Sequence, residues 1–111
     1  MAKKGFRSFL DDLDVVDELR RVTKPVDCRQ LSALAEQAEE ATMFENIESY
    51  PGWRVATALV STRKRLAVAI GCTEKRIAFE FESRSAKPIN PVTIENAPCQ
   101  EVVMEGDAVD L

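Results

Sequence analysis

The sequence feature that most limits the fold is a proline-containing break at residues 87–91, Lys-Pro-Ile-Asn-Pro. Pro88 and Pro91 cannot donate backbone hydrogen bonds, and each disfavours a helical conformation for the residue before it. Most of the clear helical and strand periodicity precedes this break. We therefore expect a folded domain over residues 1–86, followed by a linker and a strand-like segment over residues 87–111.

Length and apolar content are sufficient for one such domain. A chain of 111 residues should bury roughly two-thirds of the surface that its unfolded form exposes. Apolar residues make up 45% of the chain, with five Phe and one Trp among them, which is enough for one core. We expect a single domain with a modest margin of stability.

Helical spacing of apolar residues predicts two helices in the first half of the domain. Ser8 is expected to cap a first helix that runs to about Glu18. Asp27 and Gln30 resemble a capping box for a second helix that should end near Ala41. The apolar positions behind these predictions are Phe9, Leu10, Leu13 and Val16 in the first helix, and Leu31, Leu34, Ala35 and Ala38 in the second.

Two more helices are expected before the proline break. Ser61 or Thr62 should cap a short helix that carries Leu66, Ala69 and Ile70 and stops at Gly71, a common C-terminal glycine position. A charged amphipathic helix from Glu74 to Ser85 should follow Thr73. Its expected buried residues are Ile77, Ala78 and Phe81.

Short apolar runs predict the strands. Leu19–Val26 should lie at a sheet edge, because Pro25 lacks an amide donor. Met43–Ile47 and Arg54–Val60 should be joined by a turn at Pro51-Gly52, and we expect the second of these strands to be central because both its faces are apolar or small. The segment after the break has strand-like stretches at Val92–Ile94 and Glu101–Met104 and a turn at residues 105–107. The predicted fold class is α+β or α/β, a small mixed sheet flanked by about four helices.

Charge and hydropathy exclude two classes of function. The net charge is -4, from 15 basic and 19 acidic residues. The basic residues gather only at Lys3-Lys4 and Arg63-Lys64-Arg65, runs too short to neutralise many phosphates, so we expect no nucleic-acid binding and interpret them as a solvated helix face. No apolar run approaches the ~20 residues needed to span a bilayer, and the N-terminus has no apolar signal core. We expect no membrane association and a cytoplasmic location.

The residue inventory restricts the chemistry further. The chain has no histidine, and its four glycines are scattered, so neither the commonest general base nor a phosphate-cradling loop is present. Cys28, Cys72 and Cys99 are odd in number and far apart, which favours reduced thiols over a disulfide framework or a zinc site. We assign no catalytic, cofactor-binding or metal-binding residue.

Three features could still suggest catalysis or ligand binding, and each also has a structural explanation. Glu45-Asn46 resembles an acid with an orienting amide, but a side chain leaving a strand and an Asn in a turn explain it better. Cys99 could be a nucleophile, yet it lacks a histidine to activate it. Trp53 beside Arg54 could stack on a planar ligand, although a Trp beside a turn more often covers a core edge.

An ordered set of stretches carries a resemblance to a known family. These stretches are the Phe9-Leu10 helix, Glu18–Asp27, Leu31–Ala38 (LSALAEQA), Phe44–Asn46 (FEN), Tyr50–Val55 (YPGWRV), Ser61–Ala67 (STRKRLA), Ala97–Val103 and Gly106–Leu111. Together they resemble the N-terminal domain of the UbiD-like decarboxylases, which depend on prenylated FMN. The last two stretches resemble the segment by which that family leaves this domain and enters its flavin-binding barrel.

The resemblance implies a reversible decarboxylation of aromatic or unsaturated carboxylic acids. In that family the prenylated FMN, its divalent metal, its potassium ion and the catalytic Glu-Arg-Glu network lie in the barrel beyond this domain. The resemblance therefore implies that this chain binds no cofactor itself and lacks the catalytic and flavin-binding parts. Its implied partner is the remainder of the decarboxylase, in the same polypeptide or in a separate chain.

Two hypotheses about function stay open at this point. The chain is either a scaffold domain of a larger decarboxylase or a separate small subunit that docks on a flavin-containing chain and regulates or completes it. Met1 suggests a genuine N-terminus, and the end at Asp110-Leu111 favours a truncated or split polypeptide. We also expect residues 92–111 to be adhesive and to support self-association.

Overall fold

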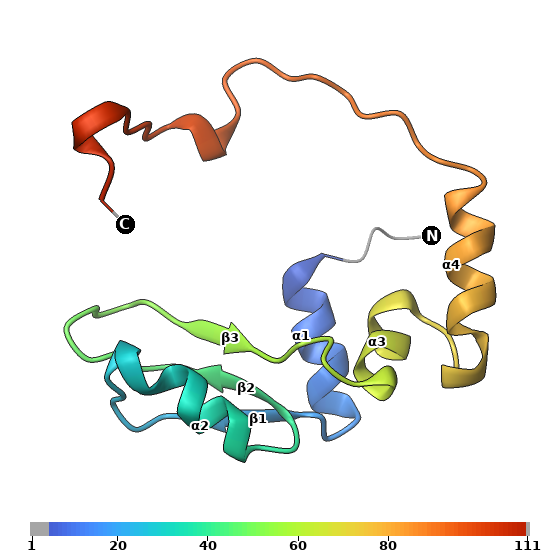
Figure 1. Ribbon diagram of the computed structural model, residues 1–111, viewed down its shortest axis with the longest axis horizontal. Helices are drawn as coiled ribbons and strands as arrows, with labels where there is room; N and C mark the ends of the chain where they lie inside the picture. The colour runs from blue at the N-terminus through green and yellow to red at the C-terminus, as the bar shows by residue number, and fades with distance from the viewer. Residues whose placement is uncertain (1–4, 111) are drawn as a thin grey trace.

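The computed structural model describes residues 5–110, which form a small α+β fold (Figure 1). Met1, the Lys3-Lys4 pair and Leu111 lie outside these residues. Within them, a three-stranded mixed sheet is accompanied by four α-helices, so the predicted fold class is confirmed. The strands are β1 (Leu19–Val22), β2 (Ala41–Phe44) and β3 (Val55–Thr57), and the α-helices are α1 (Phe6–Val15), α2 (Leu31–Gln37), α3 (Arg63–Ile70) and α4 (Ile77–Ser85).

The central strand of the sheet is β2, not the strand that the sequence predicted. β2 pairs in parallel with β1, from Leu19 opposite Ala41, and antiparallel with β3. The expectation of a central strand over Arg54–Val60 is wrong, because β3 lies at an edge and covers only Val55–Thr57. The physical reason is local: Ala58 has a φ of 56°, which turns the chain out of the extended conformation.

The expected edge position of the first strand is confirmed, although that strand is shorter than predicted. β1 ends at Val22, and Val26 then forms an isolated parallel bridge with Ile47. Pro25, which has no amide donor, lies in the unpaired stretch between them. The predicted strand Met43–Ile47 is likewise shifted, since its paired residues begin two positions earlier.

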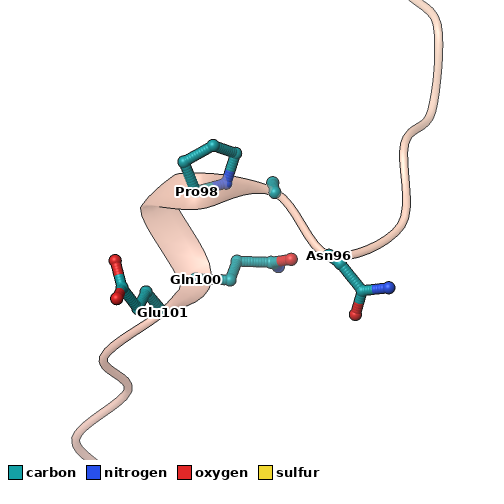
Figure 2. Close-up of a pocket in the computed structure, with 5 residues that line it drawn as sticks. Asn96, Pro98, Gln100 and Glu101 are labelled. Carbon is teal, nitrogen blue, oxygen red and sulfur yellow. The ribbon is translucent and has the colours of Figure 1, made fainter.

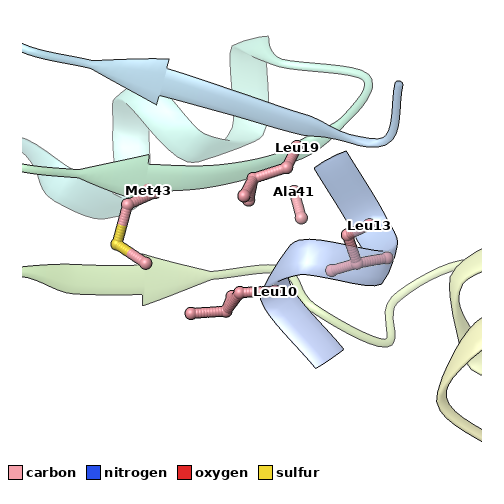
Figure 3. Packing of buried hydrophobic residues seen from close by; sticks show 5 residues of the cluster. All are labelled: Leu10, Leu13, Leu19, Ala41 and Met43. Carbon is pink, nitrogen blue, oxygen red and sulfur yellow. The ribbon is translucent and has the colours of Figure 1, made fainter. Parts of the chain in front are cut away.

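Side chains of β2 point alternately into two apolar clusters, one on each face of the sheet. Ala41 and Met43 pack with Leu10, Leu13 and Leu19 between the sheet and α1, as Figure 3 shows. Phe44 packs on the opposite face with Val26 and Ile47, and Leu31 at the start of α2 packs against them. All four residues of β2 are buried as a result.

The first two helices differ from their predicted limits. α1 begins after Gly5, and the Ser8 hydroxyl donates to the Gly5 carbonyl from within the first turn (2.8 Å), so Ser8 is not the cap. Asp27 does act as a cap, accepting from the Arg29 amide at 2.9 Å, but it opens a short 3-10 turn before α2. α2 ends at Gln37 because the chain must join the sheet at Ala41.

The next two helices follow the prediction more closely. Thr62 caps α3 by accepting from the Arg65 amide, and Gly71 ends the helix with a φ of 82°, as expected. α4 buries Ile77 as predicted, but the expected burial of Ala78 and Phe81 is wrong, since both are exposed. The main contacts of α4 within residues 5–110 are with α3 and with the 3-10 turn at Glu74–Arg76, and most of the helix is exposed.

The segment after α4 extends away from the body of the molecule in a wide arc (Figure 1). The strands expected at Val92–Ile94 and Glu101–Met104 do not form; the segment has 3-10 turns at Pro98–Gln100 and Gly106–Ala108 instead. A single extended segment gains little without a partner strand. The radius of gyration is 17.4 Å, against the roughly 13 Å expected for a compact chain of this length.

Candidate functional site

The most elaborate polar cluster is centred on Arg65, a buried arginine on α3. Its guanidinium donates to the Ala58 carbonyl (2.9 Å), the Glu39 carbonyl (3.0 Å), Glu18 Oε2 (3.0 Å) and Ser61 Oγ (2.6 Å). These partners lie in the α1–β1 connection, the α2–β2 connection and the β3–α3 connection. Arg65 therefore joins α3 to three separate loops, and all of its side-chain nitrogens are engaged.

Glu18 completes this cluster as its anion. Lys64 Nζ lies 2.9 Å from Glu18 Oε1, while Arg65 holds the other oxygen. The hydrogen bond from Lys64, helped by Arg65, lowers the pKa of Glu18 below its ordinary value. A carboxylate stabilised in its charged form by two cations is a poor proton donor near neutral pH, so the geometry fits a structural role.

The basic run Arg63-Lys64-Arg65 is thereby explained, with one correction. The interpretation as a solvated helix face is wrong for Arg65, which is only 2% exposed. Arg63 also has an internal partner, donating to the Glu74 carbonyl at 3.1 Å. Sequence reasoning missed the Glu18–Arg65 ion pair because the two residues are 47 positions apart and no local pattern connects them.

The structure places Glu45 and Asn46 on the surface without bringing them together as an acid and its orienting amide. Arg21 donates to Glu45 Oε1 at 2.9 Å and also binds Asp14. The backbone carbonyl of Asn46 accepts a hydrogen bond from the Val26 amide at 3.1 Å, and Asn46 is exposed. Both residues thus contribute to strand connections.

Cys99 lies in the short turn Pro98–Gln100 of the extended segment. A hollow of about 490 Å³ surrounds this turn and is lined by its neighbours Asn96, Ala97, Pro98, Gln100 and Glu101. Figure 2 shows that Asn96 and Glu101 point away from one another on either side of the turn. The structure pairs none of the three cysteines, and residues 5–110 hold no group of three or more His, Cys, Asp or Glu placed to bind a metal ion.

The main aromatic feature is a surface around Trp53, which we call the Trp53 surface and define by Phe6, Arg7, Tyr50, Trp53 and Arg54. Its three aromatic side chains are all more than half exposed. The Pro51-Gly52 turn presents Tyr50 and Trp53, with Gly52 at a φ of 82°, while Phe6 is the first residue of α1. The expectation that Trp53 covers a core edge is wrong, because 69% of this residue is exposed.

Two hollows flank Trp53. One, of about 250 Å³, is lined by Cys28, Ile47, Tyr50, Trp53 and Val55. The other, of about 240 Å³, is lined by Phe6, Arg7, Leu10, Met43, Gly52, Trp53, Arg54 and Ala56. Both are smaller than the roughly 300–1,000 Å³ of pockets that enclose a ligand.

The described residues do not fit a flavin mononucleotide. The hollows beside Trp53 are too small to enclose it, and the larger hollow at residues 96–101 surrounds a single turn. A third hollow, of about 380 Å³, lies beside Arg65, whose guanidinium nitrogens are all bonded within the protein and cannot hold a phosphate. A flavin phosphate also needs converging donors such as a glycine-rich loop at a helix N-terminus, and each of the four glycines stands alone in the sequence. No step of flavin chemistry is therefore derived for this chain.

Fold and surface together define a small α+β domain whose buried polar cluster joins its own elements and whose aromatic surface is open. A family model described as "3-octaprenyl-4-hydroxybenzoate carboxy-lyase N-terminal domain" matches residues 10–85, more than half of the chain and all of the sheet. The chain therefore belongs to the UbiD-like decarboxylase family and contains its N-terminal domain. This match confirms the resemblance seen in the sequence. Among residues 5–110, no helix is long and apolar enough to cross a membrane.

Proposed function

We propose that this chain is a non-catalytic N-terminal domain or small subunit of a reversible decarboxylase that acts on aromatic or unsaturated carboxylic acids. One observation carries the proposal: the region matched to the family's N-terminal domain is the same region whose buried ionic cluster is committed to packing. Arg65 lines a hollow of about 380 Å³ together with Glu36 and Thr62, but every nitrogen of its guanidinium already bonds within the protein, and Glu18 is held by Lys64 and Arg65. The domain would thus act as a scaffold.

In this proposal the prenylated FMN, a divalent metal and potassium are bound by the remainder of the enzyme. Bound there, prenylated FMN would supply the chemistry of carbon dioxide loss. Residues 1–86 form the scaffold domain, and residues 87–111 lead toward the flavin-binding part. The complete protein would be cytoplasmic.

Titration of the purified chain with prenylated FMN and manganese tests the division of roles. We expect no saturable change in flavin absorbance or heat up to ~10 µM ligand, a concentration that corresponds to about -7 kcal/mol. The chain should instead restore decarboxylation when it is added to a family decarboxylase that lacks its own N-terminal domain. Tight flavin binding by the isolated chain would contradict the proposal.

A second candidate is a stand-alone regulatory subunit that docks on a flavin-containing chain. The observation that favours it is the open Trp53 surface, since exposed aromatic residues are enriched at protein interfaces. Adding the chain to an intact family decarboxylase distinguishes the two candidates. A regulatory subunit changes the rate of the intact enzyme, whereas a scaffold domain changes only the enzyme that lacks this part.

A further inference from the structure

We propose that the Trp53 surface binds the C-terminal segment, residues 101–110, of a second copy of this chain. This proposal goes beyond the decarboxylase role proposed above: it concerns contacts of residues 101–110 between copies of the 111-residue chain itself, not their path toward a flavin-binding part. The exposed segment of one copy would be the ligand, and the Trp53 surface of the other copy would be its binding site. The result is a dimer in which two copies exchange their C-terminal segments.

The receptor side offers apolar area, positive charge and an open strand edge. Phe6 and Trp53 are 59% and 69% exposed. Arg7 and Arg54 lie beside them and form no ion pair with the residues that the structure describes. β3 is paired only with β2 within residues 5–110, so its outer edge is open to an added strand.

The segment supplies the complementary groups. Val102, Val103 and Met104 are 72%, 65% and 58% exposed, so three consecutive apolar side chains lie in solvent. Four acidic residues accompany them, Glu101, Glu105, Asp107 and Asp110, and residues 88–110 contain no lysine or arginine. An acidic, apolar segment matches a surface that is aromatic and carries two unpaired arginines.

A second copy is favoured over the chain's own segment by where that segment lies. The apolar side chains of residues 102–104 remain exposed, and the extended arc in Figure 1 leaves the segment off the body of its own domain. Each copy therefore presents both an unfilled surface and an unused segment. If each copy places its segment on the Trp53 surface of the other copy, both surfaces and both segments are occupied. The result is a closed twofold dimer.

Sedimentation and fluorescence of the full chain test this proposal. Trp53 is the only tryptophan, so its emission reports on its own surface. As concentration rises, the mass should double and the Trp53 emission should shift to shorter wavelength over the same range. Substituting Val102→Asp with Val103→Asp should weaken dimerisation at least tenfold and remove the shift.

Charge exchange provides a sharper test. One variant carries Arg7→Glu with Arg54→Glu, and the other carries Glu101→Lys with Glu105→Lys. Each should be monomeric alone, because both contacts of its dimer are repulsive. A mixture of the two should form a heterodimer, because both contacts then pair opposite charges. Circular dichroism of each variant checks that it is folded.

Two matched controls separate this surface from general effects. Phe81→Ser removes an aromatic residue of nearly equal exposure (67%) from α4, and Lys75→Glu reverses an exposed charge. Neither should change dimerisation. A chain that stays monomeric up to ~1 mM would overturn the proposal. So would a dimer that ignores charge exchange, or a Trp53 shift that does not depend on concentration, which would indicate docking within one chain.

Discussion

At the scale of single residues, Arg65 shows most clearly what sequence could and could not predict. The limits of its helix were predicted well, with Ser61 or Thr62 as the cap and Gly71 as the end, because caps depend on a few adjacent residues. The burial of Arg65 depends on Glu18, Glu39 and Ala58, which come together only when the sheet has formed. Patterns among neighbouring residues cannot predict that these three distant residues surround Arg65.

Arg65→Met should cost about 3 kcal/mol of unfolding free energy, because it leaves the Ala58 and Glu39 carbonyls without their donor and removes one of the two cations that hold Glu18. Urea unfolding measures this cost. The matched control is Lys64→Met, which removes the exposed partner of the same carboxylate and should cost under about 1 kcal/mol. If both substitutions lower the unfolding free energy equally, the burial of Arg65 does not determine how strongly this cluster stabilises the fold.

Glu18 should make stability depend on pH in the acid range. Its pKa is lowered in the folded state, so its contribution is present above the unfolded pKa of 4.5 and is lost as pH falls through the folded value. The difference in unfolding free energy between the natural chain and Glu18→Gln should be largest near neutral pH and shrink below about pH 4.5. Urea unfolding across this pH range gives the difference. A constant difference would mean that the charge on Glu18 does not contribute.

At the scale of elements, the sequence predicted the number of helices and the mixed sheet but not which strand is central. The apolar run at residues 54–60 resembled a buried strand, yet only its first half pairs, and the rest forms the turn after Ala58. The real centre, Ala41–Phe44, was divided between an expected helix end and an expected strand start. The sequence feature that marks the central strand is the run of uncharged residues between Glu40 and Glu45.

The corrected order of strands predicts which core substitution is more harmful. Phe44 is completely buried on β2, whereas Leu59 is only partly buried beside the first cluster. Phe44→Ala should therefore cost ~3–5 kcal/mol. Leu59→Ala should cost about 1–2 kcal/mol, since its site already touches solvent. Urea unfolding of both variants gives the comparison, and a larger loss for Leu59→Ala would restore the original assignment of the central strand.

At the scale of the whole molecule, the proline break was the most informative part of the sequence. Residues 87–91 are exposed and lack helix or strand, and the chain beyond them is extended. The strands expected beyond them could not be judged from sequence, because a strand exists only if a partner is available. The Trp53 surface was similarly hidden, since sequence shows where a tryptophan is but not how much of it is covered.

A chain shortened to residues 1–86 should remain folded with nearly unchanged stability. Both apolar clusters lie before residue 86, and so do the ion pairs found among residues 5–110. At concentrations where the full chain is monomeric, we expect a change in unfolding free energy within about 0.5 kcal/mol, because the removed residues are exposed. Urea unfolding and small-angle scattering test this, with a smaller radius of gyration expected. A loss above about 1 kcal/mol would assign the segment a part in the fold.

The exposed arc also determines how the protein responds to proteases of different specificity. Exposed, irregular segments are preferred sites of cleavage. Trypsin finds only Lys87 there, and the bond after it leads to Pro88, which this enzyme cuts poorly; the preceding basic residue, Arg84, lies in α4. A glutamate-specific protease finds Glu95, Glu101 and Glu105 on open chain. Resistance to trypsin would therefore be a poor sign that this end of the protein is packed.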